Sequence, residues 1–131
     1  MSTSTRTQIS TPNAPAAVGP YSQAIVAGGF VHCAGQVALV PETGKMLEGD
    51  VAAQAEQVFQ NLKAVLAEAG TSLERAVKVQ VWLKSMDDFQ TVNAVYAKHF
   101  EGMVPPARAC VEVARLPLDA LVEIDCLALV D

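Results

Sequence analysis

Apolar residues recur at helical spacing in two segments of the chain. After Asp50, a residue type that often precedes the first turn of a helix, they follow one another at steps of three and four as far as Gly70. A second apolar stripe of the same kind runs over residues 89–100 and is stopped by two prolines. The pattern predicts two amphipathic helices, and polar residues cover their outer faces.

Before, between and after these helices the apolar residues alternate with polar ones or cluster, as in strands with one or two buried faces. Gly28-Gly29 separates two of these segments and is a hairpin signal. The predicted order of strands and helices is ββαβαββ, which is typical of an α+β fold with a mixed β-sheet and two helices packed on one face. Nothing divides the chain, so residues 1–131 form one predicted domain, with 1–6 as a loose tail. The predicted strands are 23–27, 30–40, 76–83, 107–113 and 121–130.

The chain carries fewer charges than its size would lead one to expect. Of its 131 residues 18% are charged, 14 acidic and 9 basic, whereas about 25% is usual. Residues 7–41 hold no charged residue at all, but prolines, glycines and polar side chains interrupt them, so they predict neither a signal peptide nor a membrane span. We expect another copy of the chain to cover part of this poorly charged surface.

The net charge, the cysteines and the histidines indicate which environment and which partners the protein has. The net charge is −5 and no basic cluster is present, which argues against nucleic acid as the main partner. Three cysteines without a paired spacing favour a reduced, cytoplasmic setting. Neither of the two histidines has a spacing that suggests a metal site.

Two C-terminal strands carry polar residues at alternate positions. Arg108, Cys110 and Glu112 alternate with apolar residues on one strand, as do Glu123 and Asp125 on the other. If the apolar sides of both strands face the helices, these polar residues share the uncovered face of the sheet. There the arginine could bind a carboxylate with two parallel donors while a neighbouring carboxylate handles a proton. The alternative is a cross-strand salt bridge on a solvated face.

Three further residues allow two interpretations each, and a fourth, Trp82, suggests one. Asn93 borders the apolar stripe of the second helix, and it either bonds locally or orients a ligand. Tyr21 either packs at a boundary with its hydroxyl in water or lines a site. Cys110 is favoured as a small strand hydrophobe over a nucleophile, because no histidine accompanies it. Trp82, predicted on the uncovered face, suits a subunit interface.

Segments at both ends of the chain resemble the signatures of the reactive intermediate deaminase family, also called RidA or YjgF. Residues 13–24, Asn-Ala-Pro-Ala-Ala-Val-Gly-Pro-Tyr-Ser-Gln-Ala, are similar to its N-terminal signature. Residues 106–117, Pro-Ala-Arg-Ala-Cys-Val-Glu-Val-Ala-Arg-Leu-Pro, and then Val-Glu-Ile at 122–124 are similar to its C-terminal signature. Shorter matching segments lie at 34–36, 41–44 and 91–93, so the resemblance covers nearly the whole chain.

The resemblance implies a chorismate-mutase-like fold and a homotrimer whose sheets pack into a central barrel, with three clefts at the subunit interfaces. It also implies an activity in metabolite damage control, the hydrolysis of 2-iminobutanoate and 2-iminopropanoate to 2-keto acids and ammonia. Such imines and their enamine tautomers are released by pyridoxal-phosphate enzymes. The resemblance implies no cofactor and no metal for the hydrolysis itself.

By position, the resemblance also assigns roles. Arg108 would hold the substrate carboxylate, and Glu123 would activate or position the attacking water. Ala34 stands where many deaminase members have a hydroxyl residue, so we expect a shifted substrate preference or rate rather than loss of the reaction. The other residues implied in substrate binding are Tyr21, Gly35, Asn93 and Cys110, the second and the fourth through their backbone.

Two other functions stay open at this point. The same clefts could serve a small-molecule-binding or protein-binding module, or a holdase-like protein, without turnover. Ribonuclease activity on messenger RNA is also linked to the family. The acidic balance, the lack of a basic stripe and the two isolated histidines disfavour the ribonuclease.

Overall fold

The computed structural model describes residues 5–131, which fold around one six-stranded sheet with the strand order β1-β2-β3-β6-β4-β5. Strands β4 and β5 pair in parallel and all other neighbours pair antiparallel, so the predicted mixed sheet is confirmed. The strands are β1 (Thr7–Ile9), β2 (Ala24–Ala27), β3 (Phe30–Gln36), β4 (Ala76–Leu83), β5 (Ala107–Glu112) and β6 (Val122–Leu129). The helices are α1 (Val51–Glu68) and α2 (Phe89–His99).

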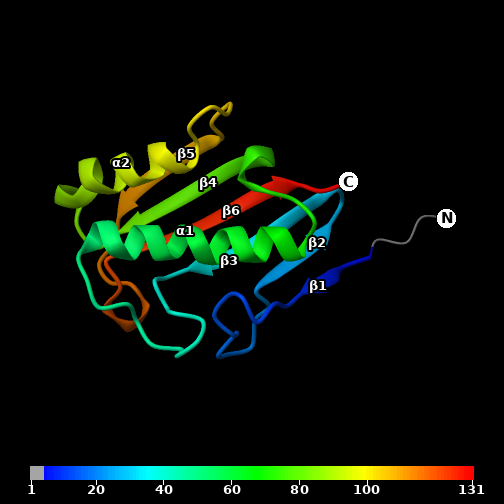
Figure 1. Cartoon of the computed structure of the whole chain (residues 1–131), viewed down its shortest axis with the longest axis horizontal. Helices are drawn as coiled ribbons and strands as arrows, with labels where there is room; N and C mark the ends of the chain where they lie inside the picture. Colours follow the sequence, from blue (N-terminus) through cyan, green and yellow to red (C-terminus); the bar gives the residue numbers. More distant parts are fainter. Residues whose placement is uncertain (1–4) are drawn as a thin grey trace.

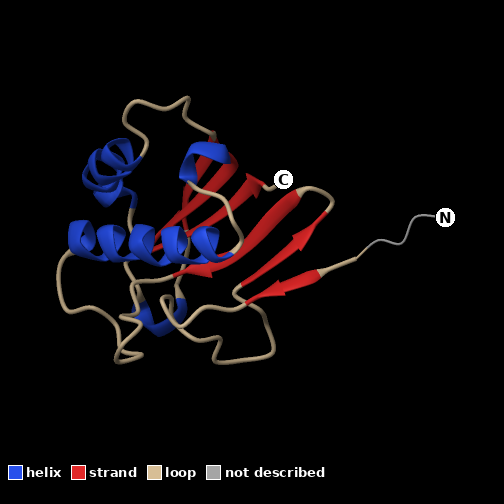
Figure 2. Cartoon of the chain, turned by 45° about the vertical axis from the view of Figure 1, so that its right-hand side comes forward, coloured by secondary structure: helices blue, strands red, loops and turns tan. Residues whose placement is uncertain are grey.

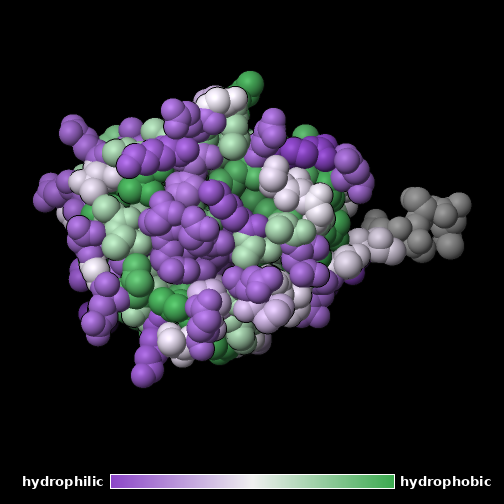
Figure 3. All heavy atoms as spheres, viewed as in Figure 1, coloured by the Kyte–Doolittle hydropathy of each residue, from purple (hydrophilic) through white to green (hydrophobic). Residues whose placement is uncertain are grey.

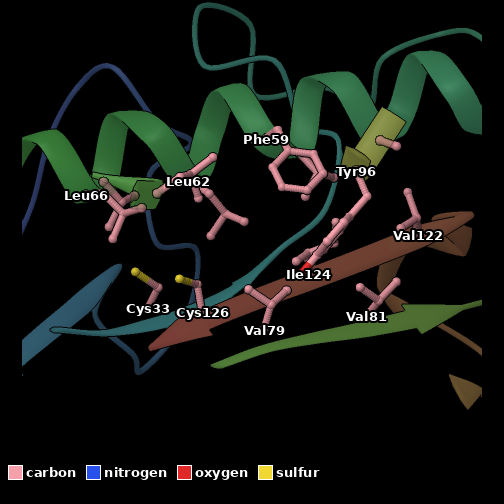
Figure 4. Packing of buried hydrophobic residues seen from close by; sticks show 14 of the residues in the cluster. Cys33, Phe59, Leu62, Leu66, Val79, Val81, Tyr96, Val122, Ile124 and Cys126 are labelled. Atoms are coloured by element: carbon pink, nitrogen blue, oxygen red, sulfur yellow. The ribbon is translucent and has the colours of Figure 1, made fainter. Parts of the chain in front are cut away.

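Both helices pack on the same face of the sheet, as the sequence predicted (Figures 1 and 2). Asp50 caps α1, since its Oδ1 accepts a hydrogen bond from the backbone N–H of Ala53 at 2.9 Å. The apolar stripe of α1 packs on the sheet, while the surface over its outer face is mainly hydrophilic (Figure 3). The largest fully buried side chains between the two layers include Phe59, Leu62, Leu66, Val79, Val81 and Ile124 (Figure 4).

The boundaries near the N-terminus differ from the prediction. Strand β1 was not predicted, because three residues are too few to show an alternation. Strand β3 ends at Gln36 rather than at residue 40, after a register shift that begins at Cys33. The chain then turns, and the buried Asn61 of α1 donates hydrogen bonds to the carbonyls of Val37 and Leu39 at 3.2 and 2.9 Å. Most of the expected tail, residues 1–4, lies outside the described residues.

The alternation predicted for β4 holds only from its third residue onwards. Val79, Val81 and Leu83 are buried beneath the helices. The pairing of β4 with β6 shifts in register before Lys78, and Val77 is therefore 38% exposed instead of facing the core. Neither helix in residues 5–131 combines the length and the hydrophobicity that a membrane crossing requires.

Candidate active site

Strand β5 turns its polar residues toward helix α2. Arg108 lies beside Val79 in the parallel pair of β5 and β4, and Cys110 lies beside Val81. Both valines are buried beneath the helices, and neighbours in a sheet point to the same side, so Arg108, Cys110 and Glu112 lie on the helix-covered face. The prediction that placed them on the uncovered face is wrong. Because β5 is an edge strand, its apolar residues do not have to face the main core.

Glu123 and Asp125 lie on the other side of the sheet. They pair with Trp82 and Gln80 of β4, which alternate with the buried valines and so point to the uncovered face. The indole Nε1 of Trp82 donates a hydrogen bond to Oδ2 of Asp125 at 3.3 Å. The prediction that Glu123 and Asp125 lie on the uncovered face therefore agrees with the structure. Within one chain, therefore, the sheet separates Glu123 from Arg108.

Neutral groups hold the guanidinium of Arg108 in place. Its Nη1 donates to Oδ1 of Asn93 at 2.7 Å, and its Cζ lies 4.6 Å from the ring centroid of Tyr96 and 5.6 Å from that of Phe89. These distances are typical of cation–π contacts. Among residues 5–131 no carboxylate forms a salt bridge with this guanidinium. Its charge is oriented but not neutralised, which suits the binding of an anion.

The aromatic partners of Arg108 were missed as site residues in the sequence. Phe89 and Tyr96 were assigned to the apolar stripe of α2, and Tyr96 is indeed buried. Asn93 follows Phe89 by four residues and precedes Tyr96 by three, a spacing that puts all three side chains on one helix face. This face lies against β5, where Asn93 bonds across to another element rather than locally. We call Phe89, Asn93, Tyr96, Arg108 and Cys110 the arginine cluster.

The hydroxyl of Tyr96 is buried without a hydrogen-bond partner in the described residues. The ring extends from α2 toward Ile124 on the sheet (Figure 4). Burial raises the pKa of Tyr96, and the nearby charge of Arg108 only partly opposes this. A buried hydroxyl that lacks a partner costs about 1–3 kcal/mol.

We expect the variant Tyr96→Phe to be at least as stable as the native protein. It keeps the ring against Arg108 and removes the unpartnered hydroxyl, so the free energy of unfolding should rise by about 1 kcal/mol. Urea denaturation of both proteins measures the difference. A loss of about 1 kcal/mol or more would contradict the expectation, because it would require a stabilising partner for the hydroxyl.

On the uncovered face, the carboxylate of Glu123 lies over Gly35. Gly35 stands within the register shift of β3, and a Cβ added to it would be only 2.9 Å from Cδ of Glu123. Burial, and secondly the charge of Asp125, raise the pKa of Glu123. Burial also raises the pKa of Asp125, although the hydrogen bond from Trp82 opposes this. We call Gly35, Trp82, Glu123 and Asp125 the glutamate cluster.

The raised pKa predicts that Glu123→Gln stabilises the protein at neutral pH. Above its raised pKa the carboxylate is ionised in both states, and the folded state holds that charge less favourably than the unfolded state. Below the usual value of about 4.5 both states are protonated and this disadvantage is gone. The difference in Tm between variant and native protein should therefore grow as pH rises. A difference that is constant or shrinks would contradict the assignment.

The loop before β2 is fixed next to strand β3. The buried amide of Gln23 bonds both backbone groups of Thr11, at 2.7 and 3.1 Å, and the carbonyl of Gln23 accepts from Ala34 N–H at 2.9 Å. Tyr21 lies two residues earlier, is 49% exposed, and its hydroxyl accepts from the N–H of Val18 at 3.3 Å. Tyr21 is thus held close to β2 and β3, which β6 and β4 separate from β5 in the strand order.

The thiols are protonated and do not resemble nucleophiles. Burial raises the pKa of Cys110 and raises that of Cys126 to about 12. Cys33 lies opposite Cys126 in the pair of β3 and β6, and both are free and buried. Within residues 5–131 no three histidines, cysteines or carboxylates gather as a metal site would require.

The fold and the two clusters define a small α+β protein that presents an arginine with no carboxylate partner among residues 5–131 and, on the other face, a partly buried glutamate. A family model described as "Endoribonuclease L-PSP" matches residues 11–130. A RutC family protein of Synechocystis is 58% identical over 121 residues, which cover 92% of this chain and 93% of that protein. The chain belongs to the RidA/YjgF family.

Two further relatives bear on function. A 2-iminobutanoate/2-iminopropanoate deaminase of Salmonella typhimurium is 47% identical over 122 residues, which cover 92% of this chain and 94% of that enzyme. The crystal structure of E. coli TdcF with bound serine matches with a TM-score of 0.91 at 38% identity, over 95% of this chain and 99% of that one. The names within this family thus include both deaminase and endoribonuclease.

Proposed function

We propose that the protein is a hydrolase that converts 2-iminobutanoate and 2-iminopropanoate to 2-keto acids and ammonia. The observation that carries the proposal is the guanidinium of Arg108, which Asn93 and two aromatic rings orient without neutralising it. Such a group favours a ligand with a carboxylate, and 2-imino acids carry one. The Salmonella relative bears the name of this activity, and the E. coli relative was crystallised with serine, also a carboxylate ligand.

The proposed site needs two copies of the chain, because one copy keeps Arg108 and Glu123 on opposite faces of the sheet. The arginine cluster lies at the edge strand β5, where a second chain can approach it. The uncovered face carries the half-buried Trp82 and the exposed Val111, and such side chains suit an interface. We propose a homotrimer in which the arginine cluster of one chain faces the glutamate cluster of the next.

In this cleft the hydrolysis needs orientation and proton transfer. The donors of Arg108 that Asn93 leaves free bind the substrate carboxylate, and the backbone at Cys110 contacts the imine nitrogen. Glu123 accepts a proton from water while the water oxygen bonds to the carbon of the protonated imine and the C=N π electrons move to nitrogen, which gives a neutral carbinolamine. Glu123 then returns the proton to nitrogen and takes up the hydroxyl proton as the carbonyl forms and the C–N bond breaks, which releases ammonia and the keto acid. Tyr21 and Gly35 line the cleft.

The test of the proposed function follows the decay of 2-iminobutanoate generated by a threonine dehydratase, with and without the protein. We expect the protein to accelerate the decay in proportion to its concentration. No acceleration would refute the proposal. Ligand-dependent melting with 2-keto acids in the absence of hydrolysis would instead support a binding module.

The variant Gly35→Ala should lower kcat by about tenfold or more with a smaller change in KM. The added Cβ collides with the carboxylate of Glu123 and must displace it from its place over β3. Steady-state kinetics of the variant measure the effect. In a Glu123→Ala background the same change should have little further effect, because the collision is gone. Equal losses in both backgrounds would contradict this account of Gly35.

A further inference from the structure

A cavity beside Arg108 bears on which substrate the site accepts. Helix α2, the loop that follows it and the start of β5 border an open cavity of about 470 Å³. Arg108 and Asn93 provide its polar groups. The other walls are aromatic or aliphatic, and they include Ala97, Phe100 and Met103. The cavity therefore combines one anion-binding position with an apolar remainder.

The size of the cavity does not match a short side chain. Pockets of about 300–1,000 Å³ hold drug-sized ligands, whereas a four-carbon imino acid is much smaller. With its carboxylate on Arg108, 2-iminobutanoate would leave most of the cavity unfilled. Arg108 is the only charged residue of the lining, and the carboxylate engages it. The described residues of this chain that line the cavity therefore offer no second charge to a substrate side chain, which favours an apolar one.

Resting on the proposed function, we propose that this cavity is the subsite for the substrate side chain and that the protein prefers 2-imino acids with branched or aromatic apolar side chains. The carboxylate binds Arg108, and the apolar tail contacts Ala97, Phe100 and Met103. Each additional buried carbon adds favourable contact with these walls. The preference follows from the dimensions and the lining of this cavity, and it does not depend on the chemical step.

The test measures binding of two stable keto acids by titration calorimetry. We expect 4-methyl-2-oxopentanoate to bind about tenfold more tightly than 2-oxobutanoate, since two more carbons are buried, with a more negative heat capacity change. Ala97→Leu fills the cavity and should abolish the preference. Ala94→Leu is the matched control, because Ala94 is exposed on the same helix and outside the lining, and it should keep the preference.

Equal or weaker binding of the larger acid would overturn the proposal, as would a preference that Ala97→Leu leaves intact or a failure of both acids to bind. Because keto acids bind without turnover, this result is separate from the result for the proposed function. Preferential binding without imine hydrolysis would refute the deaminase and leave the subsite. Imine hydrolysis without preferential binding of the larger keto acid would support the deaminase and refute the subsite.

Discussion

Arg108→Ala is expected to lower kcat/KM for 2-iminobutanoate by about 10² to 10⁴. Charge-assisted hydrogen bonds contribute about 1.5–3 kcal/mol each, and the variant loses two that bind and orient the substrate carboxylate. The cation–π contacts and the bond to Asn93 involve the arginine side chain itself, so alanine leaves the aromatic rings in place. Initial rates of imine decay measure the loss.

Two variants separate the geometry of Arg108 from its charge. Arg108→Lys keeps the charge but not the planar pair of donors. Its kcat/KM should therefore lie between that of Arg108→Ala and that of the native protein. Arg75→Ala removes an equal charge from an exposed arginine that pairs with Asp131 at 2.8 Å, and should change kcat/KM by no more than about twofold. Native rates in Arg108→Ala would remove the basis of the proposed function.

Glu123→Ala is expected to lower kcat by about 10² to 10⁴, with a smaller change in KM, because a group that moves a proton acts mainly on the chemical step. In the native protein the activity should fall as pH drops and Glu123 is protonated. Since burial and Asp125 raise the pKa of Glu123, this fall should occur above the usual value of about 4.5. The pH dependence of kcat measures both effects.

Asp125→Asn is the matched control for Glu123. It lies on the same face of β6, keeps the carboxylate of Glu123 and removes the neighbouring charge that helps to raise its pKa. The acid limb of the kcat profile should therefore move to lower pH in this variant. An acid limb that stays in place would show that the titrating group is not Glu123.

Helices and most strands could be predicted because their periodicity is local. The repeat after Asp50 and the alternation from Val79 to Leu83 reflect burial of one face, and both elements formed where expected. The side to which β5 turns could not be predicted in this way. Alternation shows that Arg108 and Ala109 point to opposite sides, but only the pairing with β4 decides which side the helices cover.

The sequence indicated some residues of the arginine and glutamate clusters but not others. The resemblance at both ends of the chain indicated Arg108 and Glu123, whereas nothing local indicated that Tyr96 would be at once a core residue and a contact of the guanidinium. The place of Gly35 beneath Glu123 depends on the irregular pairing of β3 with β6. Such irregularities arise from tertiary pairing, and the alternation of residue types does not reveal them.

The claim that one site draws on two chains is tested most directly by combining two inactive variants. Arg108→Ala and Glu123→Ala chains with different tags are co-expressed, and oligomers that carry both tags are isolated. If Arg108 and Glu123 of a site come from different chains, one of the three sites in each trimer that carries both tags contains both residues, and about a third of the native activity should return. If both residues came from the same chain, no site would be restored. Mixed oligomers as inactive as each variant alone would contradict the account.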